Sequence, residues 1–355
     1  MVAEIDKYLK EVVERRGSDL HLKADEPPII RTQGMLKRLD GYKPFSADEV
    51  KELIFPIMTD EQKERFKRDL ELDIAYELPG MARFRMNVFL QRGKVGVAVR
   101  VIPLVVKSID EWGLPEILKK IALFSQGFVL VTGPTGVGKS TTLAAIIEEI
   151  NMKRKRHIIT IEDPIEYVLD DKESVIEQRA IGVDTYSFEE ALKRVVRQNP
   201  DVIMVGEMRD RETISLALNA AEMGALVFAT LHTPDAPQTV DRIVDVFDPE
   251  HQHQIRLQFA STVRAIISQT LLRRSDGTGR IAAFEILIGT KGITSAIREG
   301  KVEQIYNMIK AGQKYGMRLL DDSLKEIYLR GYVDYEEALS KVSNPKAFES
   351  SLARG

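Results

Sequence analysis

The chain has 355 residues, a formal net charge of −3, 44% hydrophobic and 30% charged residues, and no cysteine. This is the composition of a globular protein with room for two or three domains, and its near-neutral charge gives no overall attraction to nucleic acid. The lack of cysteine excludes disulfides and thiolate zinc sites, and no run of about 18 apolar residues predicts a segment inserted in a membrane.

The first hundred residues predict a small α+β domain with an antiparallel sheet. Its predicted elements are a helix at residues 2–15, a strand at 18–22, a hairpin at 29–39 that turns at Gln33-Gly34, a helix at 46–70, and strands at 72–77, 82–90 and 95–102. Ser46 and Glu49 match a capping box at the start of the second helix. We expect this domain to span residues 1–103 and a linker to span residues 104–115.

Residues 116–355 predict a second domain of the α/β class. Short apolar runs recur there with helical stretches between them, which is typical of a parallel sheet with crossover helices. The four apolar runs are residues 128–132, 158–161, 202–205 and 225–231. After Asp248-Pro249 we expect mainly helix, with one strand at residues 281–288.

The loop after the first apolar run carries a complete phosphate-binding motif, G-x-x-x-x-G-K-[ST]. Its residues are Gly133, Pro134, Thr135, Gly136, Val137, Gly138, Lys139 and Ser140. Glycines allow backbone N–H groups to turn inward around phosphate oxygens, and the following helix adds the positive end of its dipole. We predict that the segment from Gly133 to Thr141 binds ATP, that Lys139 reaches the β- and γ-phosphates, and that Ser140 ligates Mg²⁺.

Each of the other three apolar runs ends in ionisable residues. In a parallel sheet the carboxyl ends of the strands meet at one edge, where ligands bind. Glu207 follows the third run, and we predict that it holds Mg²⁺ as the acid of a Walker B motif. Glu166 is our candidate for orienting the attacking water, with Glu162 and Asp163 as alternatives. His232, after the last run, is predicted to donate to the γ-phosphate.

Arginines on the predicted strands of the first domain are further candidates, because the transition state of phosphoryl transfer gains from cationic donors. Four of them alternate with apolar residues: Arg83, Arg85, Arg92 and Arg100. From this spacing alone, a contact with nucleotide and a solvated sheet face are equally favoured.

Together these motifs resemble the type IV pilus retraction ATPases, the twitching-motility motors of the secretion ATPase superfamily, and the resemblance spans nearly the whole chain. The segments that carry it are Ser18–Leu22, the acidic segment Glu162–Glu166, the Walker B segment Val205–Asp210, the histidine segment Thr230–Thr233 with Asp241-Arg242, and Ala296–Glu299. The last of these is similar to a short C-terminal motif of the retraction branch.

The resemblance implies a PAS-like first domain, a RecA-like second domain, and a homo-hexameric ring with nucleotide at the domain interface. It also implies that Arg85 and Arg100 contact nucleotide and that Glu166 is the catalytic acid. It places the protein in the cytoplasm, peripheral to the inner membrane through a pilus platform protein, with no nucleic acid partner.

Pilus assembly and type II secretion ATPases are the alternative within the same superfamily. They are typically longer and carry a four-cysteine zinc motif, so the absence of cysteine argues against them. A nucleotide-gated adaptor is disfavoured because Lys139, Glu166, Glu207 and His232 are all present. A nucleic-acid translocase is disfavoured by the near-neutral charge and by the lack of an aromatic-rich basic stretch.

Overall fold

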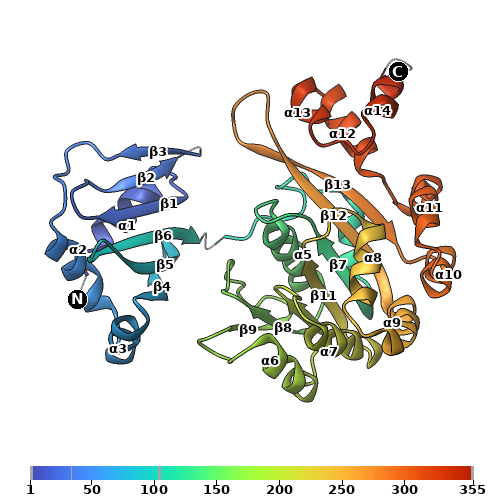
Figure 1. Ribbon diagram of the computed structural model, residues 1–355, viewed down its shortest axis with the longest axis horizontal. Helices are drawn as coiled ribbons and strands as arrows, with labels where there is room; N and C mark the ends of the chain where they lie inside the picture. Colours follow the sequence, from blue (N-terminus) through green and yellow to red (C-terminus); the bar gives the residue numbers. More distant parts are fainter. Residues whose placement is uncertain (1–2, 33, 103–104, 353–355) are drawn as a thin grey trace. The chain divides into compact units, whose positions relative to one another are not determined.

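The computed structural model describes residues 3–32, 34–102 and 105–352, and the chain forms two compact units, Met1–Val105 and Val106–Gly355 (Figure 1). The predicted linker starts at residue 104, which lies outside the described residues, as does Gln33 of the predicted hairpin turn. Across the helices that the structure describes, none combines the length and the hydrophobicity needed to cross a bilayer.

The first unit is built on one antiparallel six-stranded sheet, ordered β3-β2-β1-β6-β5-β4. Its strands are β1 (Asp19–Lys23), β2 (Ile29–Thr32), β3 (Met35–Arg38), β4 (Glu71–Leu78), β5 (Ala82–Gln91) and β6 (Lys94–Ile102). Its helices are α1 (Asp6–Glu14), α2 (Ala47–Ile54) and α3 (Asp60–Asp69). Leu9 of α1 and Val50 of α2 belong to the same buried core as Phe84 of β5, so the helices cover the apolar side chains of the sheet.

Residues 46–70 form two helices, whereas the sequence predicted one. The predicted capping box is confirmed: Glu49 N–H donates to Ser46 Oγ over 3.1 Å, and Ser46 N–H donates to Glu49 Oε2 over 2.5 Å. A 3₁₀ turn then contains Pro56, which has no N–H to continue the α-helical pattern. Thr59 and Gln62 form a second capping box that starts α3.

The second unit is built on a seven-stranded sheet, ordered β13-β12-β7-β11-β10-β8-β9. Its strands are β7 (Gly127–Thr132), β8 (His157–Glu162), β9 (Val175–Ala180), β10 (Val202–Val205), β11 (Leu226–Leu231), β12 (Val263–Arg273) and β13 (Arg280–Ile288). All neighbouring strands are parallel except β12 and β13, which form an antiparallel pair. The predicted α/β class, with a parallel sheet and crossover helices, is confirmed.

Helices cover both faces of this sheet. They are α4 (Ile117–Ala122), α5 (Lys139–Lys153), α6 (Phe188–Val195), α7 (Arg211–Glu222), α8 (Ala236–Asp245), α9 (Pro249–Thr262), α10 (Lys291–Glu299), α11 (Ile305–Ala311), α12 (Leu320–Leu329), α13 (Tyr335–Leu339) and α14 (Pro345–Leu352). Successive strand residues point to opposite faces. Accordingly, Val129 of β7 shares a core with Ile146 of α5, whereas Leu130 shares a different core with Leu218 of α7 and Phe259 of α9.

Two strands of the second unit were not predicted. The sequence pattern predicted mainly helix after Pro249, but residues 263–273 form β12, which lies between β7 and β13. Strand β9 was missed because its alternating polar residues look like a loop, although it pairs with β8 along its whole length. The predicted strand at 281–288 is confirmed as part of β13.

Candidate active site

The phosphate-binding motif lies between a buried strand and a helix. Strand β7 is buried along its whole length, and α5 starts at Lys139 directly after the loop. The φ angles of Gly133, Gly136 and Gly138 are 136°, 81° and 89°, which side chains other than glycine rarely adopt. The three glycines are therefore required by the backbone of the loop, whose N–H groups and following helix N-terminus suit a phosphate.

The Lys139 side chain folds back over the loop. Its Nζ donates to the carbonyl oxygens of Gly133, over 2.7 Å, and Pro134, over 3.1 Å. Burial lowers the pKa of Lys139, and the negative charges of Glu207 and Glu166 oppose this effect. Both acids therefore favour the charged form of the Lys139 amine, which we expect at the phosphates.

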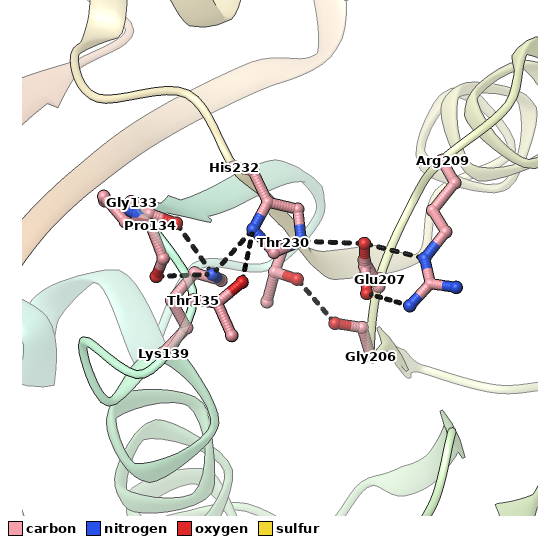
Figure 2. A network of polar contacts seen from close by, with 9 residues as sticks. All are labelled: Gly133, Pro134, Thr135, Lys139, Gly206, Glu207, Arg209, Thr230 and His232. Atoms are coloured by element: carbon pink, nitrogen blue, oxygen red, sulfur yellow. Dashed lines mark hydrogen bonds and ion pairs between the residues drawn. The ribbon is translucent and has the colours of Figure 1, made fainter.

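His232 lies between Lys139 and Glu207 (Figure 2). Glu207 follows the carboxyl end of β10, and His232 follows that of β11. His232 Nε2 lies 2.8 Å from Glu207 Oε1, and His232 Nδ1 lies 3.5 Å from Lys139 Nζ and from Thr135 Oγ1. Lysine only donates hydrogen bonds, so this geometry fits a histidine that accepts at Nδ1 and donates to the carboxylate from Nε2. A continuous line of contacts thus runs from the P-loop lysine to the predicted Walker B acid.

Arg209 holds the same carboxylate from the other side. Its Nε and Nη2 donate to Glu207 Oε1 and Oε2, each over 2.8 Å. These hydrogen bonds are the main reason that the pKa of Glu207 lies below its ordinary value, with a further contribution from His232. Sequence reasoning gave Arg209 no role, although its position two residues after Glu207 is the signal that places it there.

The three acids at and after the end of β8 differ in their surroundings. Glu162 is 7% exposed, and its Oε1 accepts from Thr160 Oγ1 over 2.7 Å and from Gln178 Nε2 over 3.1 Å. Burial raises the pKa of Glu162 to about 6. Asp163 and Glu166 are exposed. The negative charge of Asp163 raises the pKa of Arg209, and that of Glu166 raises the pKa of Lys139. Of the three, Glu166 is the exposed acid whose charge acts on the P-loop lysine.

Tyr167 links this acidic segment to the P-loop helix. Its hydroxyl lies 2.8 Å from Thr141 Oγ1, directly after the motif. The Glu166 backbone N–H also approaches Glu162 Oε2, at 3.4 Å. The segment that carries Glu166 is thus attached both to β8 and to α5. Nothing in the sequence pattern singled out Tyr167, because its partner is 26 residues away.

The donor set fits Mg²⁺. The described residues contain no group of three or more histidines and acids placed to hold a metal ion. Mg²⁺ is usually held by one or two protein oxygens together with substrate phosphates, rather than by an all-protein cage. The Ser140 hydroxyl in the first turn of α5 and the Glu207 carboxylate supply oxygens of this kind.

Arg85 and Arg100 lie in the first unit, directly opposite each other on β5 and β6. Arg85 Nη2 lies 3.4 Å from Asp73 Oδ2, and Arg100 Nε lies 3.3 Å from Asp19 Oδ1. These four residues line a cavity of about 320 Å³ on the sheet of the first unit. The structure brings the two arginines together, and their contact with nucleotide stays a prediction.

One family model, curated relatives and a solved structure match most of this chain. The family described as Type II/IV secretion system protein matches residues 1–339. The type IV pilus retraction ATPase PilT of Pseudomonas aeruginosa is 45% identical over 97% of this chain and 100% of its own length. A twitching motility protein of Neisseria gonorrhoeae is 46% identical over 90% of this chain and 85% of its own length. A crystal structure of the pilus retraction motor PilT with bound ADP superposes with a TM-score of 0.91, at 40% identity, covering 99% of this chain and 100% of that one.

Proposed function

Since the chain belongs to the Type II/IV secretion system protein family, we propose that it is an ATP-hydrolysing motor that powers the retraction of type IV pili. The observation that carries this proposal is the line of contacts from Lys139 through His232 to Glu207, at the edge of the sheet where the P-loop lies. These are the kinds of group that phosphoryl transfer needs around its phosphates.

In the proposed mechanism the P-loop binds the phosphates of ATP. Lys139 exchanges its bonds with the Gly133 and Pro134 carbonyls for phosphate oxygens. When bound, Mg²⁺ neutralises charge on the phosphoryl group that is transferred. The Ser140 hydroxyl and the Glu207 carboxylate would hold the ion, and Arg209 would compete with it for the Glu207 carboxylate.

Glu166 is proposed to orient the water that attacks the γ-phosphate. Its charge acts on Lys139, so it lies near the amine that we expect at the phosphates. His232 is proposed to report the presence of the γ-phosphate to Glu207, because one ring nitrogen faces Lys139 and Thr135 and the other faces the carboxylate. Glu162 is proposed to support the Glu166 segment from its buried position at the end of β8.

The proposed assembly is a ring of six copies in the cytoplasm, attached to the inner membrane through a pilus platform protein. In this ring the first unit, PAS-like in our interpretation, supplies Arg85 and Arg100 to nucleotide held by the RecA-like second unit. Residues 104–115 are proposed to be the linker across which the two domains change position during the ATP cycle.

Hydrolysis by the purified full-length protein tests the chemistry. Lys139→Ala is expected to abolish phosphate release and to weaken nucleotide binding. Glu166→Gln is expected to keep ATP binding and to lose about 10²–10⁴-fold in turnover. Lys153→Ala, at the exposed far end of the same helix, is the matched control and should retain activity. Undiminished phosphate release by Lys139→Ala is incompatible with the proposed site.

The C-terminal segment Ala296–Glu299 is proposed to couple hydrolysis to the pilus machinery. It lies in α10, where Ile293, Ala296 and Ile297 are buried as their spacing predicts, while Arg298 and Glu299 are exposed. Combined Arg298→Ala and Glu299→Ala substitutions should keep ATPase activity and lose surface motility in cells. Normal motility of the double variant would leave the segment as an ordinary surface helix.

A further inference from the structure

A buried glutamine on β12 contacts the back of the P-loop. Gln269 is 3% exposed and lies on the strand that pairs with β7. Its Nε2 donates to the Val137 carbonyl over 2.5 Å, and its Oε1 accepts from Thr142 Oγ1 over 2.8 Å. One side-chain amide therefore joins the loop to the helix that follows it, because its nitrogen and its oxygen each make a hydrogen bond.

Gln269 also lies close to both ends of the loop. A Cβ atom at Gly133 would lie 2.4 Å from the Gln269 carbonyl oxygen, which is closer than any side chain allows. A Cβ atom at Gly138 would lie 3.4 Å from Gln269 Nε2. The first and the last glycine of the motif are therefore packed against the same residue of β12.

The contact with Val137 fixes the direction of a backbone donor. In a trans peptide the C=O and the N–H of the same unit point in opposite directions. Because the Val137 carbonyl points toward Gln269, the N–H of Gly138 points away from β12. The N–H groups at this end of the loop, where α5 starts, are the donors that a phosphate-binding loop presents to its ligand.

We propose that Gln269 is a positioning residue for ATP: it holds the Val137 carbonyl behind the loop and so keeps the Gly138 N–H directed at the phosphates. The proposal rests on the nucleotide-binding function proposed above. Without the amide donor, the Val137–Gly138 peptide unit loses the partner that determines its orientation. A rotated unit presents a carbonyl oxygen, instead of an N–H donor, to an anionic phosphate.

Three single variants of the full-length protein separate the two contacts of Gln269. Gln269→Glu keeps the shape and the acceptor for Thr142, but its carboxylate has no hydrogen to donate to Val137. Gln269→Leu removes both contacts. Thr142→Val, the matched control, removes only the contact with the helix. Binding of a fluorescent ADP, the KM and kcat for ATP, and the melting temperature without nucleotide are measured for each.

The expected result is that Gln269→Glu and Gln269→Leu weaken ADP binding and raise the KM by about 10–100-fold, the effect of losing a buried hydrogen-bond donor. The kcat should change by less than about threefold, because the Gly138 contact is made in the ground state and the transition state alike. Thr142→Val should bind ADP within about threefold of the wild type, even where its melting temperature falls.

Either of two results would overturn the proposal. One is wild-type ADP affinity in Gln269→Glu. The other is a loss of affinity in Thr142→Val equal to that in Gln269→Glu, which would indicate general destabilisation of the loop. Failure of the ATPase function itself is a different result, since it requires a wild-type protein that does not bind ADP or a Lys139→Ala variant that hydrolyses ATP normally.

Discussion

Replacing Glu162 by glutamine should make the protein more stable at neutral pH. Glu162 is 7% exposed at the end of β8, and burial raises its pKa from 4.5 to about 6. At pH 7 the folded protein therefore holds a carboxylate charge in surroundings that disfavour it. Glutamine carries no charge and keeps the oxygen that accepts from Thr160 Oγ1 and Gln178 Nε2.

The size and the sign of the effect follow from the pKa. At about 1.4 kcal/mol for each tenfold change in proton affinity, a pKa that rises from 4.5 to about 6 corresponds to about 2 kcal/mol. Because the folded state binds the proton more tightly than the unfolded state, the wild type loses this stability as the pH rises from about 4.5 to about 6. Glu162→Gln should equal the wild type near pH 4 and exceed it by about 2 kcal/mol above pH 7.

Thermal unfolding of the nucleotide-free protein between pH 4 and pH 8 measures the difference. For a unit of about 250 residues, 2 kcal/mol corresponds to a shift of about 4 °C. Asp163→Asn, at an exposed neighbouring position, is the control and should show no such pH-dependent gain. ATPase activity of Glu162→Gln should stay within about tenfold of the wild type, unlike that of Glu166→Gln.

Two results would refute this reasoning. A Glu162→Gln variant that is less stable than the wild type at pH 7.5 would mean that the surrounding donors stabilise the charge more than burial destabilises it. A loss of hydrolysis as large as that of Glu166→Gln would transfer the catalytic role to Glu162.

Three further predictions rest on other contacts. Glu285 is 5% exposed on β13, and burial raises its pKa from 4.5 to about 7. In thermal unfolding, Glu285→Gln should therefore be about 3 kcal/mol more stable than the wild type at pH 8 and equal to it near pH 4. Arg209→Ala removes the arginine from both oxygens of Glu207 and leaves His232 at Oε1. It should lower the Mg²⁺ concentration for half-maximal hydrolysis by about twofold to fivefold, whereas an increase would contradict the assignment of Glu207 to Mg²⁺. Arg85→Ala and Arg100→Ala should each lower kcat by about 10³-fold, as loss of an arginine that stabilises the transition state does. Arg83→Ala, on the same strand as Arg85, is the control and should keep the wild-type kcat. A normal kcat in both Arg85→Ala and Arg100→Ala would show that these arginines do not belong to the site.

The parts of the fold that could be predicted from the sequence are those with local signals. The P-loop motif has a fixed spacing, and its strand and helix show distinct periodicities. The apolar runs that became β8, β10 and β11 each end in a polar residue, which indicated where Glu162, Glu207 and His232 would lie. The capping box of Ser46 and Glu49 is local in the same way.

The parts that were missed depend on contacts between distant residues. Strand β12 contains Ser268 and Gln269, which interrupt its apolar pattern. Both side chains form hydrogen bonds with residues about 130 positions away, in or beside the P-loop. The burial of Glu162 and the bond between Tyr167 and Thr141 likewise depend on how the segment after β8 folds against its neighbours. No window of sequence contains both members of such a pair.

The most direct measurement is made in cells of the organism that carries this chain. Its gene is deleted, and surface pili are counted alongside surface motility. A retraction motor predicts that pili remain or accumulate while motility is lost, and that the wild-type gene restores motility but the Lys139→Ala variant does not. Loss of the pili themselves on deletion would contradict retraction and identify the protein as an assembly motor.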